Sequence, residues 1–311
     1  MLSIAALMLG IAAAAPQAAA GELFADPLFS RGFHLTTANH PAPGEEPGLL
    51  RLPGAPGGTP AWRLAQWSSA HLLATGVFAE AGGGRWVAET PGKRVVLARP
   101  AGGGVSVFLE VNGGAEYGGG FRALNEPWPH LLIEQRFGEP VRPAQFPGLR
   151  FSLEFRVDHC RPAPGVEAAR LDPGLHTAQV SAYFTVNNLN PASADHNEMI
   201  WFGIPLFDAR RPLPPPHYAV DRGSEFCSGK FICTLDGARF WRGATGDGGW
   251  RGLDADLSQL LREALALSQG HGYLARTEFA DLALTTFNLG WELPGPFDAA
   301  IELRNPSLRA R

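Results

Sequence analysis

Two glutamates stand beside aromatic residues, where a pair of carboxylates could carry out acid and base chemistry. Glu198 lies in ADHNEMIWFGIPLFD, next to a run of Met, Ile, Trp and Phe. Glu292 lies in TTFNLGWELPGPF, where strand alternation puts Thr286, Asn288 and Glu292 on one face. Two carboxyl groups cleave a glycosidic bond with retention when roughly 5 to 5.5 Å apart, and with inversion when roughly 6.5 to 9.5 Å apart. We therefore take Glu198 and Glu292 as the candidate catalytic pair.

Each glutamate also has a plainer interpretation. Glu292 could be a solvated residue of the turn before Pro294, and Glu198 could be a solvated residue at the mouth of its strand. Which interpretation holds depends on the face of the strand that each side chain takes, because neighbouring residues in a strand point to opposite faces. The strands that must position the two glutamates therefore come next.

Most of the chain has the pattern of short strands joined by turns. Its 38 Gly and 27 Pro fall as punctuation between segments rich in β-branched and aromatic residues. Leu149 to Val157 and Thr177 to Asn187 alternate apolar and polar residues most clearly, as strands with one buried face do. Further candidates are Val105 to Val111, His130 to Phe137, Lys230 to Leu235 and Phe279 to Leu289. The series predicts an all-β fold, an antiparallel two-sheet β-sandwich or jelly roll.

One amphipathic helix is predicted from Leu253 to Ser268, because its apolar residues recur at intervals of three and four. Asp254 or Asp256 can cap its start, and Gly270 can end it. A single helix of this kind is expected to pack on the outside of the sandwich.

The first twenty residues, MLSIAALMLGIAAAAPQAAA, are uncharged, apolar and end in small residues. They are typical of a secretory signal peptide and predict a secreted or periplasmic protein, with no membrane partner after signal cleavage. Residues 21–311 are then expected to form a single β-jelly-roll domain with N-terminal elaborations. Cys227 and Cys233 flank SGKFI and could close a short hairpin by a disulfide, which would leave Cys160 over.

The charge pattern and the motifs exclude several classes of function. The net charge is −4 with both signs mixed along the chain, so no basic stripe indicates a nucleic-acid partner. No CxxC or HExxH occurs, so a zinc site is not indicated, and no cofactor is expected.

The order of the segments resembles a known family. VSAYFTVNN precedes NEMIWFG, and an amphipathic helix, GYL, a strand and GWELPGPF follow. This order is similar to that of family 12 glycoside hydrolases, the jelly-roll endoglucanases and xyloglucanases, whose nucleophile lies in E-x-M-I-W and whose acid/base lies in G-x-E-P-[FW]. It covers the strand of Ser181 through Ile204, and Leu253 through Phe297. The resemblance implies a concanavalin-like fold, an exported hydrolase of β-linked glucan-type polysaccharides or oligosaccharides, and Glu292 as acid/base.

The sequence departs from the family pattern at the nucleophile. Aligning Met199 and Trp201 on the family's M-I-W puts Asn197 in the nucleophile's position, and Glu198 takes that position only through a one-residue shift or a β-bulge. Without the shift, the groove receives Asn197, Met199 and Trp201. A glycosidase without its nucleophile keeps only its binding groove, so a non-catalytic, lectin-like protein is an alternative.

Other polar residues favour sugar binding or a different reaction. Gln179 and Tyr183, together with His176 and Arg122, are of the types used by jelly-roll polysaccharide lyases, in which Tyr or His moves a proton. His176 could equally be a satisfied histidine at a strand end. The substrate-binding candidates are Asn197, Met199, Trp201, Gln179, Tyr183, Asn288, Trp128 and His130.

Overall fold

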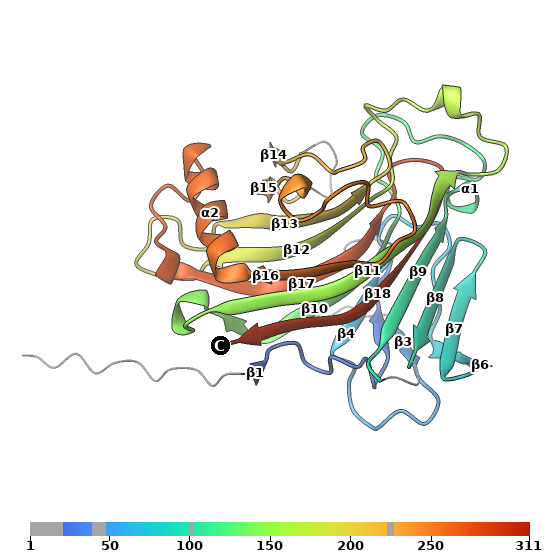
Figure 1. Cartoon of the computed structure of the whole chain (residues 1–311), viewed down its shortest axis with the longest axis horizontal. Coiled ribbons are helices and arrows are strands. Elements are labelled where there is room, and N and C mark those ends of the chain that lie inside the picture. Colours follow the sequence, from blue (N-terminus) through green and yellow to red (C-terminus); the bar gives the residue numbers. More distant parts are fainter. Residues whose placement is uncertain (1–20, 39–47, 100–102, 223–226) are drawn as a thin grey trace, which may run out of the picture.

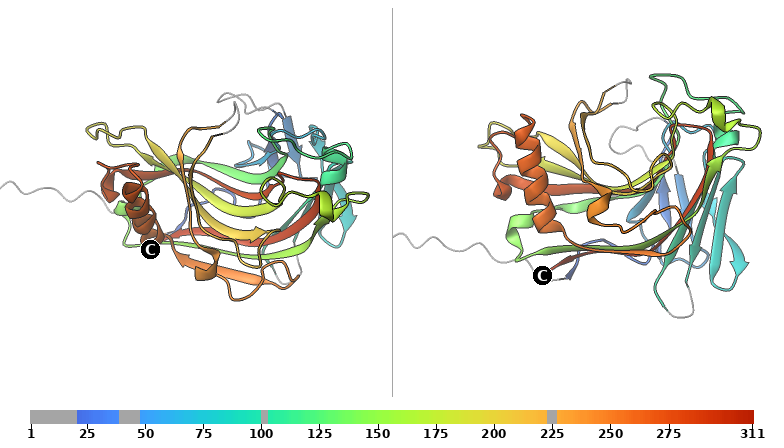
Figure 2. Two further views of the ribbon diagram at one scale, coloured as in Figure 1. Left: turned by 90° about the horizontal axis from the view of Figure 1, so that it is seen from above. Right: turned by 45° about the horizontal axis from the view of Figure 1, so that its top comes forward.

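The computed structural model describes residues 21–38, 48–99, 103–222 and 227–311. The predicted signal peptide therefore lies outside the described residues. Two large sheets pack face to face along the molecule, and the wider of them curves (Figures 1 and 2). The prediction of an all-β, two-sheet sandwich is confirmed, and strands from both ends of the chain contribute to the sheets.

Sheet A has eight strands, and its edge strand β16 belongs to the chain's later part. In order across the sheet these are β16 (Arg251–Asp256), β11 (Leu149–Pro162), β18 (Phe297–Ala310), β9 (Ser106–Asn112), β8 (Lys93–Ala98), β7 (Arg85–Thr90) and β6 (Ala79–Gly82), with β1 (Gly21–Glu22) also paired to β18.

Sheet B has ten strands and carries both segments that contain the candidate glutamates. Its order is β14 (His217–Val220), β15 (Phe231–Thr234), β13 (Met199–Asp208), β12 (Gln179–Asn188), β17 (Leu282–Glu292), β10 (His130–Val141), β4 (Trp62–Ala65), β2 (Phe33–Leu35), β3 (Gly48–Arg51) and β5 (Gly76–Val77). The four central strands, from β13 to β10, pair antiparallel.

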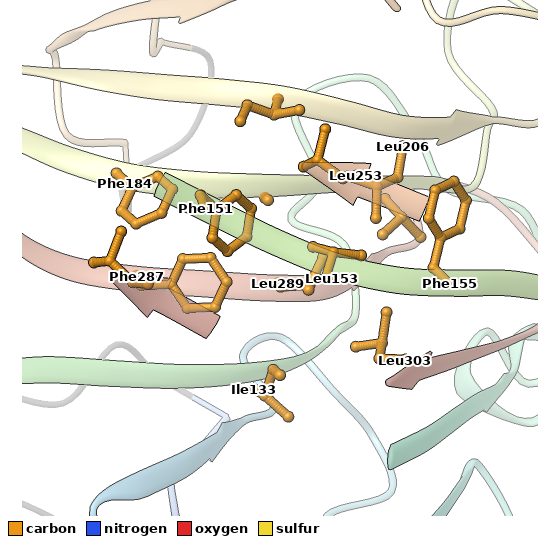
Figure 3. Close-up of a cluster of buried hydrophobic side chains, with 14 of the residues drawn as sticks. Ile133, Phe151, Leu153, Phe155, Phe184, Leu206, Leu253, Phe287, Leu289 and Leu303 are labelled. Atoms are coloured by element: carbon orange, nitrogen blue, oxygen red, sulfur yellow. The ribbon is translucent and has the colours of Figure 1, made fainter. Parts of the chain in front are cut away.

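The core lies between the sheets and is built by strand alternation. Phe184 of β12 and Phe287 of β17 are fully buried, and their rings meet Phe151 of β11 from the opposite sheet at centroid distances of 5.3 and 5.5 Å (Figure 3). Burying rings of this size contributes strongly to stability and fixes which face of each strand points inward. The other face of sheet B is thereby left to polar side chains.

The helix forms, but it begins later than predicted. Helix α2 spans Leu257–Gly270, and the Asp256 side chain caps it by accepting a hydrogen bond from the Gln259 amide. Leu253 belongs instead to β16, which pairs with β11. The apolar spacing from Leu253 onward fits both a strand and a helix, and pairing with β11 decides between them. A shorter helix, α1 (Gly113–Glu116), follows β9.

Two smaller sequence-based expectations differ from the structure. No disulfide joins Cys227 to Cys233, and Cys233 of β15 is fully buried in the core. Phe279, expected in a strand, lies in the 3₁₀ turn Phe279–Asp281, and β17 begins only at Leu282. No helix in the described part of the chain is long and apolar enough to cross a membrane.

A buried ion pair fastens the loop after β4 to sheet A. The Lys93 ammonium lies 2.5 Å from a Glu116 carboxylate oxygen, and both side chains are completely buried. Ser69 donates to the same carboxylate, and the Ala70 amide donates to it at 2.8 Å. Burial lowers the pKa of Lys93, while the charge of Glu116 opposes that effect. The ion pair thus anchors Ser69 and Ala70, which follow Trp67 by two and three residues in the chain. Trp67 lies on the outer face of sheet B.

We expect Glu116→Gln to lower the free energy of unfolding by about 3 to 5 kcal/mol, because it leaves the Lys93 charge buried without its partner. Urea unfolding at neutral pH measures this difference. The matched control is Glu89→Gln, since Glu89 forms a loose and exposed ion pair with Arg94, and it should change the value by less than about 1 kcal/mol. Equal stabilities of the Glu116 variant and the wild type would contradict this role for the pair.

Candidate functional site

The face of sheet B turned away from the core collects polar side chains from four neighbouring strands. Strand pairing sets Glu292 of β17 directly opposite Gln179 on one side and His130 on the other. On β17, two residues before Glu292, Gly290 interrupts this polar face because it has no side chain. Further on, Asn288 lies between Tyr183 and Glu134. The polar set predicted on β12 and β17 is therefore gathered on one surface.

Glu292 is a carboxyl group in a poorly hydrated environment. Burial raises its pKa, and the negative charge of Asp221 raises it further. The Gln179 amide nitrogen donates to Glu292 Oε2 at 3.0 Å, which partly opposes the rise. A carboxylic acid with a raised pKa keeps its proton closer to neutral pH, as a general acid must.

His130 lies between two tryptophan rings at the same end of the sheet. Its ring centroid is 5.6 Å from that of Trp67 and 5.9 Å from that of Trp128. Burial lowers the pKa of His130 to about 4, so its imidazole is neutral at neutral pH. The two rings and the imidazole form an aromatic wall beside Glu292.

Tyr183 lies flat across β13 because Gly203 has no side chain. A Cβ at Gly203 would stand 2.5 Å from the tyrosine ring. The Tyr183 hydroxyl consequently reaches Thr234 of β15, at 3.0 Å from its Oγ1. Burial raises the pKa of Tyr183, and the charge of Glu292 raises it further, which places the phenol and the carboxyl group in one electrostatic environment.

A cleft of about 290 Å³ opens on this face; its β17 lining is Thr285, Thr286 and Asn288, and Glu292 lies four residues beyond Asn288 on the same strand. Met199 and Trp201, both predicted to face the groove, line it together with Asn288. The Trp201 indole nitrogen donates to the Ser228 hydroxyl at 2.9 Å, which fixes the ring at the edge of the cleft. The described residues that line it are Arg63, Trp67, Glu134, Arg136, Thr185, Asn187, Met199, Trp201, Thr285, Thr286 and Asn288.

Glu198 is not brought together with Glu292. It precedes β13, its side chain is 55% exposed, and its carboxylate forms an ion pair with Lys230 at 2.7 Å. The register aligns Glu292 with Gln179 but Met199 with Asn187, at the other end of β12. Eight residues of a strand span about 26 Å, far beyond the roughly 5 to 9.5 Å of a catalytic carboxyl pair.

No bulge turns Glu198 into the groove. Asn197 has a φ of +66°, a turn conformation, and β13 starts two residues later. Asn197 is not among the residues that line the cleft. The strand thus enters the sheet as the alternation rule requires, with Met199 and Trp201 outward and Ile200 in the core.

Several residues that line the cleft were not among the site residues predicted from the sequence. Arg63, Trp67 and Asn187 reach the cleft from three different strands or loops, which only sheet pairing brings together. Glu134 and Arg136 carried a local signal, since both share the His130 face of β10 in NEPWPHLLIEQRF. A charged strand face is costly inside a sandwich, so it marks either solvent or a groove.

The residues suggested for lyase chemistry are divided between two places. Both ring nitrogens of His176 are hydrogen-bonded to backbone, one with the Asp172 amide at 3.0 Å and the other with the Arg122 carbonyl at 2.9 Å. The Arg122 guanidinium donates to the carbonyls of Glu126 and Leu175 and stacks on Trp128. Gln179 and Tyr183 lie instead on the outer face of sheet B, where they bind Glu292 and Thr234 respectively.

No protein-family model matches the chain, and no curated protein matches its sequence. Solved structures do resemble it. A family 12 xyloglucanase from Bacillus licheniformis in complex with ligand is 11% identical, with a TM-score of 0.41 over 78% of this chain and 99% of that one. The endoglucanase of Rhodothermus marinus is 13% identical, with a TM-score of 0.37 over 73% and 92%. Endoglucanase 3 of Trichoderma harzianum is 9% identical, with a TM-score of 0.37 over 82% and 99%.

The chain is distantly similar to these family 12 glycoside hydrolase structures, and its own strand pairing shows the two-sheet sandwich. At these identities and scores the likeness concerns the chain's fold, and its chemistry has to be inferred from the residues of the cleft.

The raised pKa of Glu292 makes a prediction for stability. A proton held more tightly by the folded than by the unfolded chain stabilises the fold below the unfolded-state value, near 4.5, and this contribution is lost as pH rises through the folded-state pKa. We therefore expect the stability of the wild type relative to Glu292→Gln to fall as pH is raised from about 4 toward 8, by about 1.4 kcal/mol for each unit of raised pKa. Urea unfolding of both proteins across this range measures it, and a difference that grows with pH would contradict it.

Proposed function

We propose that the protein is an exported glycoside hydrolase that cleaves β-linked, glucan-type polysaccharide chains, with Glu292 as the general acid. The observation that carries this proposal is the carboxyl group of Glu292, whose pKa burial raises, on the same outer face of sheet B as an open cleft. Protonation of the leaving glycosidic oxygen requires an acid of this kind.

The cleft provides suitable contacts for a sugar chain. Trp201 and Trp67 offer aromatic surface, while Asn187 and Asn288 offer amide groups that can bind hydroxyls. Carbohydrate-sized ligands are commonly held by aromatic side chains with a few oriented polar groups. Gln179, Tyr183, Trp128 and His130 extend this surface to Glu292, as their contacts with each other and with Glu292 support.

The second carboxyl group of the proposed reaction is Asp221 rather than Glu198. Its charge acts on both Glu292 and Tyr183, whereas Glu198 lies at the far end of β13. Asp221 Oδ2 accepts from the Ser228 amide at 2.7 Å and from the Ser228 hydroxyl at 2.6 Å, and Ser228 in turn binds Trp201. These contacts hold a carboxylate next to an aromatic ring of the cleft.

A second candidate function is non-catalytic binding of the same polysaccharides. The ion pair of Glu198 with Lys230 favours it. Glu198 stands next to the position of the family's nucleophile, but its carboxylate is engaged in an ion pair at the surface. In that case Glu292 would serve only as a hydrogen-bonding group for the sugar. Export and the signal peptide at residues 1–20 belong to the proposal in both cases.

We expect Glu292→Gln to reduce hydrolysis of β-glucan, xyloglucan or xylan at least about a hundredfold while glycan binding is retained, because the amide is nearly isosteric but cannot donate an acidic proton. Asp221→Asn should cause a comparable loss. Reducing-end release and isothermal titration calorimetry measure the two properties, and Glu198→Gln is the matched control, with activity close to the wild type.

The outcomes separate the candidate functions. Binding without release of reducing ends by the wild type would replace the hydrolase with the carbohydrate-binding protein. Unsaturated products that absorb in the ultraviolet would instead indicate a lyase. Hydrolysis that survives in Glu292→Gln would remove Glu292 from the role of acid.

A further inference from the structure

The charges of the described residues that line the cleft do not balance. Three described residues in its lining are charged, Arg63, Glu134 and Arg136. Arg63 and Glu134 neutralise each other, since they stand opposite one another on β4 and β10 with 2.7 Å between guanidinium and carboxylate, and both are almost fully buried. The charge of Arg136 is therefore in excess.

Arg136 is positioned to meet a ligand. Its side chain is 48% exposed, and its Nε lies 3.9 Å from Glu134 Oε1, beyond hydrogen-bond distance. Its partner across β17 is Thr286, which is uncharged. Glu134 also binds Arg63 at the shorter distance, so within the described residues the Arg136 guanidinium has donors left for a group in the cleft.

The register places Arg136 in line with the aromatic side of the cleft. Arg136 pairs with Thr286, Thr286 with Thr185, and Thr185 with Trp201, which makes a row across four strands. Three strand spacings correspond to about 14 Å between the backbones at its ends, and the two long side chains shorten the open gap. A sugar against Trp201 could thus place a substituent on the guanidinium.

The other charged groups near this row are paired or lie away from Arg136. Asp221 stands at the far end of the row, where its carboxylate accepts hydrogen bonds from Ser228, which in turn binds Trp201. Lys230 and Glu198, near Met199, pair with each other at 2.7 Å. Glu292 lies at the opposite end of β17, at the level of Gln179, and is separated from Arg136 along the strand. The described part of the cleft therefore carries a net positive charge at its Arg136 end.

We propose that the cleft selects polysaccharides that carry uronic acids, and that Arg136 binds their carboxylate. This inference rests on the proposed function, because it assumes that the cleft receives a sugar chain. A guanidinium matches a carboxylate with two parallel hydrogen bonds, which gives both affinity and orientation. Arg136 is accordingly a specificity-determining residue, and Glu292 keeps the catalytic role.

The experiment compares two ligands that differ only in the carboxylate: glucuronic-acid-substituted xylan oligosaccharides, and the same oligosaccharides after reduction of the carboxyl groups. Affinities are measured by calorimetry with the full-length Glu292→Gln protein, so that no ligand is hydrolysed. We expect the acidic oligosaccharide to bind at least about tenfold more tightly, as a hydrogen bond to a charged group provides. An unsubstituted polyuronate in parallel tells whether the carboxylate must stand on a side group or on the main chain.

Introducing Arg136→Ala into the Glu292→Gln protein should abolish its preference for the acidic oligosaccharide and leave its affinity for the reduced oligosaccharide unchanged. The matched control is Arg94→Ala, because Arg94 on β8 is similarly exposed at 45% and has an equally loose ion pair, but belongs to sheet A. The Arg94→Ala variant should keep the full preference for the acidic oligosaccharide. Thermal unfolding verifies that both variants are folded.

Equal affinity of the parent protein for the two oligosaccharides, or a preference that survives Arg136→Ala, would overturn the proposal while the hydrolase assignment stands. A preference for the acidic ligand without hydrolysis by the wild type supports Arg136 and overturns only the enzyme. Failure of both ligands to bind overturns both.

Discussion

The structure depends on the burial of one face of sheet B against sheet A. Phe184 and Phe287 occupy that interface with no exposed surface, and a shift of one residue in either strand would bring polar side chains into their place. The cost of burying those polar groups without partners fixes the register of β12 and β17. The same register then determines that Gln179 and Glu292 stand side by side on the opposite face.

Buried carboxyl groups are accommodated in two ways in this protein. Glu116 and Glu134 each have a cation within 2.7 Å, so their charges are compensated where water is excluded. Glu292 has the neutral amide of Gln179 as its side-chain hydrogen-bond partner and a second acid, Asp221, in its electrostatic surroundings. Ion pairs suit a structural role, whereas a carboxyl group that holds its proton suits a chemical one.

Small residues allow the polar face to extend sideways across the sheet. Gly203 leaves room for the Tyr183 ring to cross β13 and reach Thr234 of β15. β15 runs parallel to β13, and the adjoining β14 leads directly to Asp221. Groups from the edge of the sheet thereby contribute to the surroundings of Glu292, although four strand positions separate β14 from β17.

The sequence by itself determined the class of fold and which side chains of the central strands point into the core. Apolar and polar residues alternate over Leu149 to Val157 and Thr177 to Asn187, and this local pattern is satisfied only by strands that bury their apolar face. It also placed Met199, Trp201 and Asn288 on the side that lines the cleft. The start of helix α2 could not be read in this way, since the segment from Leu253 fits two periodicities and pairing with β11 decided it.

The composition of the site was decided only by the tertiary structure. The separation of Glu198 from Glu292 follows from the register of β13 on β12, and register is a property of two paired strands rather than of either one. The approach of Arg63 to Glu134, and of Gln179 to Glu292, joins residues far apart in the chain. The sequence names the chemical groups, but the curvature and pairing of sheet B decide which of them meet, because contacts across a sheet depend on where whole strands are placed.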